Sequence, residues 1–502
     1  MNWKLIGRGL LNKDMRTKVF AVLGILIVYR LLAHVPIPLA EPAELKQILD
    51  NLINTDSPPA ILTFLNILSG GALASLSIML IGLGPYINAS IIIQVLQKAI
   101  PKLETLANEG EYGKRKLNQY TRILTFPLAI VQSIGSIFLV RQVAQQLSGL
   151  GDITANASLS QWVLMVASLT AGALILMWLG ELITEKGIGN GISILITVGI
   201  VSQLPFIFNA LWDGIRDSTQ SVEIFGLFSV PVTVVIGAGL IASTILTTLF
   251  VVYLNEAQRR IKISYAKKVQ GNRAYSDVST VLPVKLIAAG VIPIIFAVAF
   301  LSVPQLFGQL VQDSANPRLA ELGQNLVLWF TSPGGHGSTA GLIGGWEGWV
   351  YPVTYFLLVV AFTFFYTGVV FNSKEISEQL QRQGGFIEDV RPGKDTEKYL
   401  TGLVNRLNLF GATSLGLLAL TPIIAQIVFL QFNLNPAAAS QLVIGGTSIL
   451  ILVAVALDTL RQVESKALMV TYEDYDNNFY NQDDESTAKR RGFGFLRRNK
   501  KS

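Results

Sequence analysis

Few residues in this 502-residue sequence could do chemistry, and their spacing fits no common catalytic or nucleotide-binding motif. Cysteine is absent, which excludes disulfides, thiolate metal sites and cysteine nucleophiles, and the two histidines, His34 and His336, lie far apart. A phosphate-binding loop around Lys394 would need an earlier glycine and a following Ser or Thr, but Glu388 and Asp395 stand at those positions. We therefore expect any energy source to come from outside this chain.

Glycine-rich and charged positions inside the apolar stretches add little chemistry. The run GIGNG at 187–191 is not a dinucleotide-binding loop, because Ile192 breaks the fingerprint and no strand precedes it. Neither a His-Glu-x-x-His zinc helix nor a Gly-x-Ser-x-Gly elbow occurs. Arg30, His34, Glu181 and Asp458 fall near the ends of apolar stretches, and we interpret them as structural. An ion-coupled carrier normally needs a carboxylate near the bilayer midplane, and none is clearly placed there.

The elements around these positions are long apolar stretches. The sequence is 51% hydrophobic and only 14% charged, whereas soluble domains carry about 25% charged residues. About 20 apolar residues cross a bilayer as a helix, so we predict an all-α, multi-pass membrane protein with ten spans. The expected spans are 19–39, 76–98, 121–143, 161–180, 188–208, 228–254, 284–306, 349–371, 403–430 and 441–460.

Lys and Arg gather in alternate connections between these spans. They are abundant in the N-terminal arm, after the second, sixth and eighth spans, and in the C-terminal tail, whereas the connections on the opposite side of the membrane hold only Lys46, Arg216 and Arg318. Because basic residues mark the cytoplasmic side, we expect both termini in the cytoplasm. The N-terminus is charged up to Lys18 and no small-residue cleavage pattern follows the first span, so we expect no cleavable signal peptide.

Helix-breaking residues interrupt several spans, at 82–85 (GLGP), 189–191 (GNG) and 291–293 (VIP). In a membrane such breaks persist only where protein or a water-filled cavity satisfies the freed backbone groups. Singly they fit ordinary kinks in a packed bundle, whereas together they favour helices that bend around a central cavity. A half-length apolar segment, Ala60–Ala74, is too short to cross.

Three charged segments are candidates for partner contacts. The connections near 255–284 and 372–402 mix charges with Gly and aromatic residues, so we expect folded projections on which a partner docks. The basic run from Lys489 to Lys501 fits either a topology signal or a site for anionic lipid or ribosomal RNA, and the sequence leaves both open.

Ten short motifs follow one another in a family-specific order. They are GPYINASIIIQ (84–94), EGE (109–111), QYTR (119–122), WLGE (178–181), GIGNGIS (187–193), QRRI (258–261), AGVIP (289–293), FN (371–372), RPG (391–393) and GGTS (445–448). Over nearly its whole length the sequence resembles the SecY/Sec61-alpha family, the channel-forming subunit of the general protein-secretion translocase. The resemblance implies two pseudo-symmetric five-helix halves, 1–210 and 211–460, around a central hourglass pore, and a basic cytoplasmic tail at 461–502. It also implies a lateral gate of spans two and three against seven and eight.

The resemblance also assigns roles by motif position. The half-length segment near 60–74 would be a plug, with Phe64, Leu68, Ser69, Gly70 and Gly71 as its matching residues. The constriction would be a ring of aliphatic side chains: Leu83 (where an isoleucine-like residue is usual), Ile87, Ile192, Ile196, Ile295 and Ile451. An apolar neck loses its water and resists ions, and aliphatic side chains seal around a passing chain of any sequence. Without the resemblance each would be one apolar core residue among many.

Partners are implied in the same way. Arg259, Arg260 and Arg391 match the family's docking arginines, since a guanidinium pairs with phosphate or carboxylate. Arg259 and Arg260 also fit plain positive-inside charge. The implied partners are SecE-like and SecG-like small membrane subunits, a SecA-type translocation ATPase, the ribosome, unfolded precursor polypeptides and membrane lipids, at the plasma membrane of a prokaryote. The sequence does not decide whether two copies of the chain form a homodimer. We expect no cofactor, metal or catalytic residue.

The predicted function is a passive, gated channel for unfolded secretory polypeptides, which also releases hydrophobic segments sideways into lipid and is driven by an external motor or ribosome. A secondary transporter is an alternative, because such proteins also use broken helices. An intramembrane protease or lipid transferase is another, but it would need a nucleophile–base pair or a metal set. A third is an insertase that only releases helices into lipid, which the sequence separates poorly from a channel.

Overall fold

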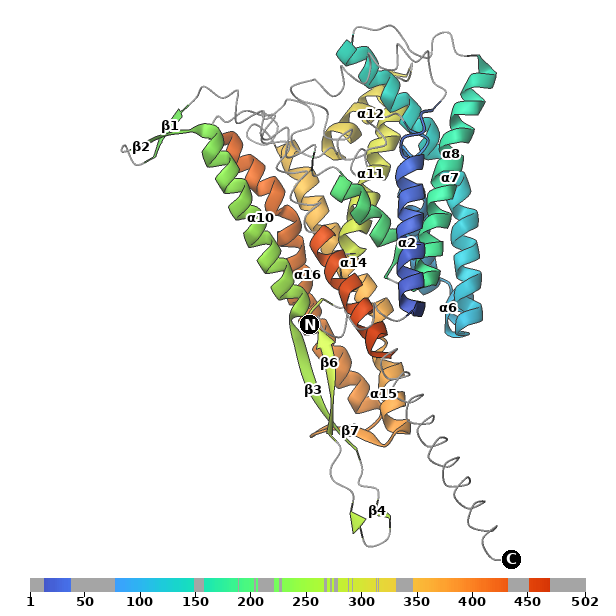
Figure 1. Cartoon of the computed structure of the whole chain (residues 1–502), viewed down its shortest axis with the longest axis vertical. Coiled ribbons are helices and arrows are strands. Elements are labelled where there is room, and N and C mark those ends of the chain that lie inside the picture. The colour runs from blue at the N-terminus through green and yellow to red at the C-terminus, as the bar shows by residue number, and fades with distance from the viewer. Residues whose placement is uncertain are drawn as a thin grey trace, which may run out of the picture.

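The structure is a bundle of long helices with a small β-sheet beyond one end (Figure 1). The computed structural model describes residues 13–37, 77–148, 158–187, 189–202, 205, 221–224, 228–265, 269–270, 273–274, 279–287, 289–290, 292–312, 314, 316–330, 346–431 and 451–469. The helices are α2 (Lys13–Leu32), α5 (Gly84–Ala99), α6 (Pro101–Asn108), α7 (Glu111–Ser148), α8 (Leu159–Lys186), α10 (Val232–Glu256), α11 (Ile292–Val311), α12 (Pro317–Phe330), α14 (Val350–Val370), α15 (Ser373–Arg382) and α16 (Lys394–Gln431), with a short 3-10 helix at Trp346–Trp349. Two more are the helix Gly191–Ser202 and a helix at 451–469, called here the C-terminal helix.

The mostly helical, membrane-spanning fold predicted from the sequence is confirmed. A helix overlaps each of the ten ranges expected to span. Among the described residues, four helical stretches are long and apolar enough to cross a bilayer: Glu111–Phe138, Leu159–Lys186, Trp346–Arg382 and Lys394–Thr421. Shorter apolar helices lie at Gly191–Ser202, Ile245–Glu256 and Ile292–Gly308, so the count of ten spans stays a prediction.

The helix-breaking motifs mark where helices begin. The second span was expected from residue 76, but α5 begins at Gly84, because residues 77–83 form turns and Gly82 has φ +65°. Pro85 then occupies the first turn, where its missing N–H is not needed. The seventh span was expected from residue 284, but α11 begins at Ile292, because the preceding residues pair as a strand.

The sheet is built from two of the segments expected to be folded projections. Strand β3 (Gln258–Tyr265) pairs antiparallel with β6 (Ser279–Lys285) on one side and with β7 (Gly385–Ile387) on the other. Ile261 of β3 is buried in a cluster with Leu400 and Val404 of α16, and the buried Ile263 is paired with Ile387 of β7. Two short antiparallel pairs complete the described strands: β1 (Ser221–Ile224) with β2 (Phe228–Pro231), and β4 (Val269–Gln270) with β5 (Arg273–Ala274).

Two apolar clusters form the core of the bundle. One draws on α2, α5, α8, the helix Gly191–Ser202 and α11, and the other on α10, α11, α14, α16 and the C-terminal helix. Helix α11 divides them, because Ile295 and Phe296 face the first cluster whereas Ile294 and Ala297 face the second. The predicted constriction, to which α11 contributes Ile295, is therefore expected in the first cluster, on one side of α11.

Candidate functional site

The six aliphatic residues predicted to form a constriction meet in the first apolar cluster. Leu83 and Ile87 come from the start of α5, Ile192 and Ile196 from the helix Gly191–Ser202, Ile295 from α11 and Ile451 from the C-terminal helix. Leu83, Ile87, Ile196 and Ile295 are buried, and the other two are partly buried. Segments separated by more than three hundred residues thus contribute to one apolar contact region.

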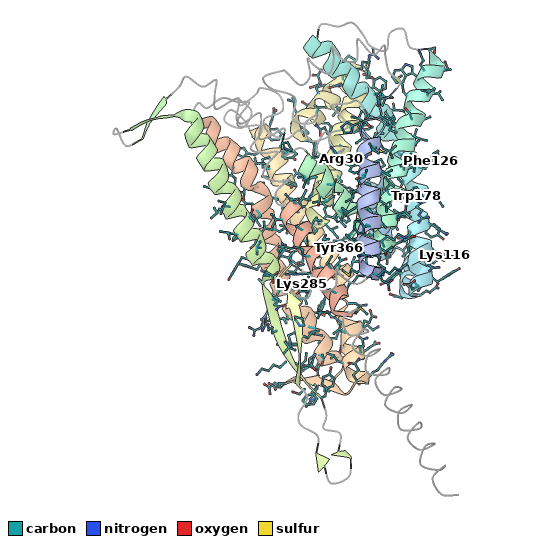
Figure 2. All side chains as sticks on the ribbon, viewed as in Figure 1. Arg30, Lys116, Phe126, Trp178, Lys285 and Tyr366 are labelled. Atoms are coloured by element: carbon teal, nitrogen blue, oxygen red, sulfur yellow. The ribbon has the colours of Figure 1, made fainter. Side chains whose placement is uncertain are left out.

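The surroundings of the six residues are equally apolar. Val22 of α2 and Leu176, Leu179 and Ile183 of α8 belong to the same cluster. Within the same cluster, Phe296 of α11 makes edge-on ring contacts with Phe362 and Tyr366 of α14, at centroid distances of 6.0 and 6.1 Å. Figure 2 shows Tyr366 in the middle of the bundle. Apolar surroundings of this kind are expected both for residues that only pack the core and for residues that seal a constriction. The role of the six residues therefore stays a prediction.

The turn that leads from α8 into the helix carrying Ile192 depends on glycine. Gly187 ends α8 with φ +74° and Gly189 follows with φ +82°, both in the left-handed region that favours glycine. A Cβ on Gly191 would lie 1.9 Å from the carbonyl oxygen of Gly180, so only glycine allows this approach to α8. The Gly191 N–H donates to Thr184 Oγ1 at 2.9 Å. The glycine run therefore serves a tight connection between helices.

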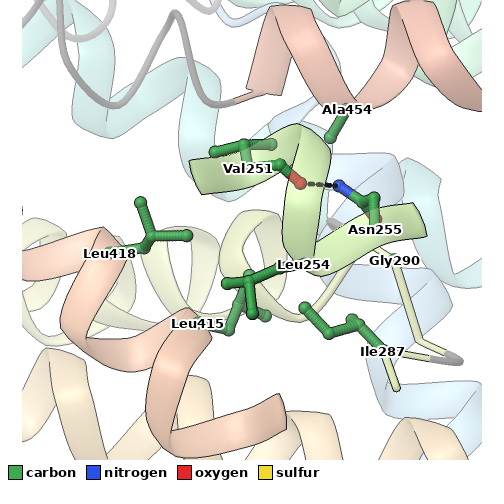
Figure 3. Close-up of a pocket in the computed structure, with 8 residues that line it drawn as sticks. All are labelled: Val251, Leu254, Asn255, Ile287, Gly290, Leu415, Leu418 and Ala454. Atoms are coloured by element: carbon green, nitrogen blue, oxygen red, sulfur yellow. Dashed lines mark hydrogen bonds between the residues drawn. The ribbon is translucent and has the colours of Figure 1, made fainter. Parts of the chain in front are cut away.

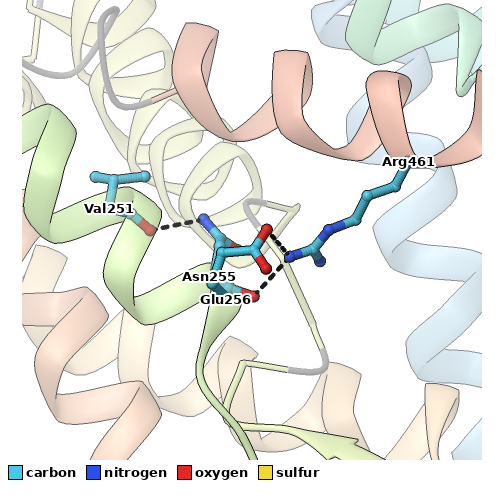
Figure 4. Close-up of polar contacts among 4 residues, drawn as sticks. All are labelled: Val251, Asn255, Glu256 and Arg461. Atoms are coloured by element: carbon cyan, nitrogen blue, oxygen red, sulfur yellow. Dashed lines mark hydrogen bonds and ion pairs between the residues drawn. The ribbon is translucent and has the colours of Figure 1, made fainter. Parts of the chain in front are cut away.

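Two ion pairs join helices beside the cluster. Arg122 of α7 pairs with Glu181 of α8 at 2.7 Å, and the Glu181 side chain is only 15% exposed, in keeping with the structural role expected for it. In the C-terminal helix, Arg461 pairs with Glu256 at the end of α10 and donates to the Asn255 carbonyl at 3.1 Å (Figure 4). Sequence reasoning missed Arg461, because nothing in the local pattern indicates a partner two hundred residues earlier.

The C-terminal helix also contacts the glycine turn. A Cβ on Gly189 would lie 3.3 Å from Thr459 Oγ1, and one on Gly187 would lie 1.9 Å from Lys466 Nζ. Burial lowers the pKa of Lys466, and the nearby charge of Lys18 lowers it further. The C-terminal helix thus connects Ile451 of the cluster, the turn after α8 and the end of α10.

A small cavity lies in the second cluster, between α10, α16 and the C-terminal helix (Figure 3). Its lining is Val251, Leu254, Asn255, Ile287, Gly290, Leu415, Leu418 and Ala454. Its volume is about 10 Å³, roughly that of a single water site. Asn255 Nδ2 is already bonded to the Val251 carbonyl at 3.2 Å. This cavity is too small for an organic substrate.

The three predicted docking arginines are exposed and lie on or beside the sheet. Arg259 and Arg260 are on β3, and Arg391 lies between β7 and α16. Across the described ranges, no ion pair involves any of the three. The predicted plug residues, Phe64, Leu68, Ser69, Gly70 and Gly71, lie outside the described residues.

Comparisons with known proteins agree with this geometry. The model of the SecY family matches residues 77–460. The protein translocase subunit SecY of Corynebacterium glutamicum is 37% identical over 462 residues, covering 92% of this chain and 97% of the relative. That of Streptomyces galbus is 37% identical over 484 residues, covering 93% and 98%.

Solved structures show the same fold. One described as the structure of a protein conducting channel aligns with a TM-score of 0.54 at 18% identity, covering 88% of this chain and 90% of the other. A second, of a SecY protein whose plug domain is described as stabilising the closed channel, aligns with a TM-score of 0.54 at 17% identity, covering 88% and 89%. With the family model matching most of the sequence and relatives aligned over nearly all of it, this chain belongs to the SecY family.

Proposed function

We propose that this chain is the channel-forming subunit of a protein translocase, a passive gated pore for unfolded secretory polypeptides. The observation that carries the proposal is the convergence of Leu83, Ile87, Ile192, Ile196, Ile295 and Ile451 in one apolar cluster. Their side chains have no polar group that could select among substrates, and an apolar neck that dewets resists ions when idle. Such a ring suits a conduit for chains of any sequence.

The lateral gate of this channel is the seam between α5 and α7 on one side and α11 and α14 on the other. Support comes from the close approach of α7 to α11, where a Cβ on Gly135 would lie 2.5 Å from Leu306 Cδ1. A side-chain contact of this apolar kind separates without breaking a polar bond. A hydrophobic segment of a client would leave through this seam into lipid.

The chain has no motor of its own in this proposal. A SecA-type ATPase or a ribosome would dock on the sheet end, at Arg259, Arg260 and Arg391, and SecE-like and SecG-like subunits would brace the bundle. The sheet end would face the cytoplasm of a prokaryote, with both termini on that side. Figure 2 supports this orientation, since Lys116 and Lys285, from two of the basic connections, lie toward the same end of the bundle.

Reconstitution tests the proposal. The chain is placed in liposomes with its small partner subunits and the ATPase, and protection of a secretory precursor from added protease is measured. We expect protection that requires both ATP and the ATPase. Absence of protection with either the ATPase or a ribosome as driver, together with saturable uptake of a small solute by this chain alone, would contradict the channel and favour a transporter.

A further inference from the structure

The outer face of the β3–β6–β7 sheet is a basic and apolar surface that nothing described above covers. Alternate residues of β3 point to opposite faces, as in any strand. Ile261 packs against α16 and Ile263 is buried on the same side of the strand, so Arg260 and Lys262 face outward, whereas Arg259 shares the inner side. Arg259 and Arg260, both predicted to dock a partner, therefore lie on opposite faces of the sheet.

Strand pairing completes the outer face. The register pairs Gln258 with Lys285, Arg260 with Pro283 and Lys262 with Val281, and places Phe386 opposite Ser264. Val281 is 46% exposed and Phe386 is 38% exposed. Named by its residues, the outer face consists of Gln258, Arg260, Lys262, Ser264, Val281, Pro283, Lys285 and Phe386. It carries three cations and three apolar side chains, with no carboxylate among these eight residues.

The sequence contains a segment of complementary chemistry just beyond the C-terminal helix. Between Lys466 and Lys489 there is no Lys or Arg, and the stretch 471–487 combines acidic with aromatic residues. Its acidic residues are Glu473, Asp474, Asp476, Asp483, Asp484 and Glu485, and its aromatic residues are Tyr472, Tyr475, Phe479 and Tyr480. Carboxylates would pair with the three cations, while aromatic rings would cover the exposed Val281 and Phe386.

The segment starts close enough to reach this face. Arg461 contacts Glu256, two residues before β3 begins, and so fixes the C-terminal helix beside the base of the sheet. From Arg461 to the helix end at residue 469 is about 12 Å at 1.5 Å per residue. The eight residues from 470 to 477 then extend up to about 26 Å, whereas β6 is roughly 23 Å long.

We propose that the outer face of the sheet is a docking surface for the chain's own acidic and aromatic segment, residues 471–487. Occupied in this way, Arg260, Lys262 and Lys285 are shielded by the chain's own carboxylates. The contact does not depend on what the channel conducts. If the proposed function also holds, an anionic partner that docks on Arg260 must first displace this segment.

Disulfide trapping in the full-length chain tests the contact, because the native sequence has no cysteine to interfere. Val281→Cys is combined with Asn477→Cys, which keeps every charge, and free thiols are counted by the gel shift of a maleimide polymer after mild oxidation. We expect rapid loss of both thiols at low salt without a dimer band. High salt should slow the loss, since at 1 M the screening length falls to about 3 Å.

Two matched controls separate docking from chance collision. Lys374→Cys with Asn477→Cys places the first thiol on exposed α15, away from the outer face, and should crosslink slowly. Adding Lys262→Glu and Lys285→Glu to the Val281 pair should reduce trapping about fivefold, since each exposed ion pair contributes only weakly to the contact. Lys374→Glu with Lys398→Glu changes the net charge equally and should leave it unchanged.

Three results would overturn the proposal. Equal trapping rates at positions 281 and 374 would mean that the segment only collides with the surface. Insensitivity to the Lys262 and Lys285 reversals would mean that charge does not hold it there. A disulfide-linked dimer in place of the internal bond would assign the face to the tail of a second copy.

Discussion

At the scale of single residues, the proposed seal of the channel depends on six aliphatic side chains that have no polar group. Ile87 and Ile295 are buried on two different helices of the same cluster, at 4% and 9% exposure. A polar side chain there would bring hydrogen-bonding capacity into a site that is sealed because it offers water none.

We expect Ile87→Asn combined with Ile295→Asn to make resting liposomes leak ions, because two amides on facing helices support a water column through the neck. The leak is measured as collapse of an imposed potassium gradient. Ile87→Leu with Ile295→Leu nearly conserves volume and should keep the seal. Equal leakage from both pairs, or from neither, would contradict the assignment of these residues to the constriction.

The six positions could be predicted only through ordered motifs. Periodicity identifies apolar helices, but it cannot say which of their many aliphatic residues meet. Ile451 and Ile87 share one apolar cluster because of the tertiary fold, which no local pattern encodes, whereas the ten motifs are specific to a family with a known geometry. Arg461 belongs to none of these motifs, and its pairing with Glu256 was missed for that reason.

At the scale of elements, small residues set how closely helices approach one another. A Cβ on Gly172 of α8 would lie 2.0 Å from the backbone carbonyl oxygen of Ile78, in the turn before α5. Backbone cannot move aside as a flexible side chain can. Gly24 of α2 is the opposite case, because nothing lies within 4 Å of its Cβ position.

We therefore expect Gly172→Ala to lower the free energy of unfolding by about 1–3 kcal/mol through overpacking. Gly24→Ala, the matched control, should be neutral or stabilising by up to about 1 kcal/mol, since alanine favours the helix. Thermal unfolding of the purified chain in detergent compares the two. A Gly172→Ala midpoint equal to that of the native chain would show that α8 and the turn are not tightly packed.

The helices were predictable because a bilayer requires long apolar runs, and the strands were less so. The seventh span was expected to begin at residue 284, but residues 279–285 pair with β3 as strand β6, and α11 begins only at Ile292. Strand pairing is set by a partner elsewhere in the sequence, so local apolarity could not separate the strand from the helix. The amphipathic helix α12, packed on α11, was also not foreseen.

At the scale of the whole molecule, the C-terminal helix connects the expected docking end to the expected constriction. Ile451 lies in the first cluster, and three turns later Arg461 contacts the end of α10, directly before β3. A partner that shifts the sheet would therefore act on the same helix that contributes to the neck. The separation into two five-helix halves remains a prediction from the resemblance.

The most direct test of the central claim asks whether a translocating polypeptide passes through the six-residue cluster. A precursor with one cysteine is stalled during ATP-driven translocation, and disulfide formation is measured with a single cysteine introduced into this cysteine-free chain. We predict that Ile295→Cys crosslinks efficiently, whereas Val353→Cys, on an exposed part of α14, does not. Efficient crosslinking at Val353 with none at Ile295 would contradict the account, because the polypeptide would then take another path.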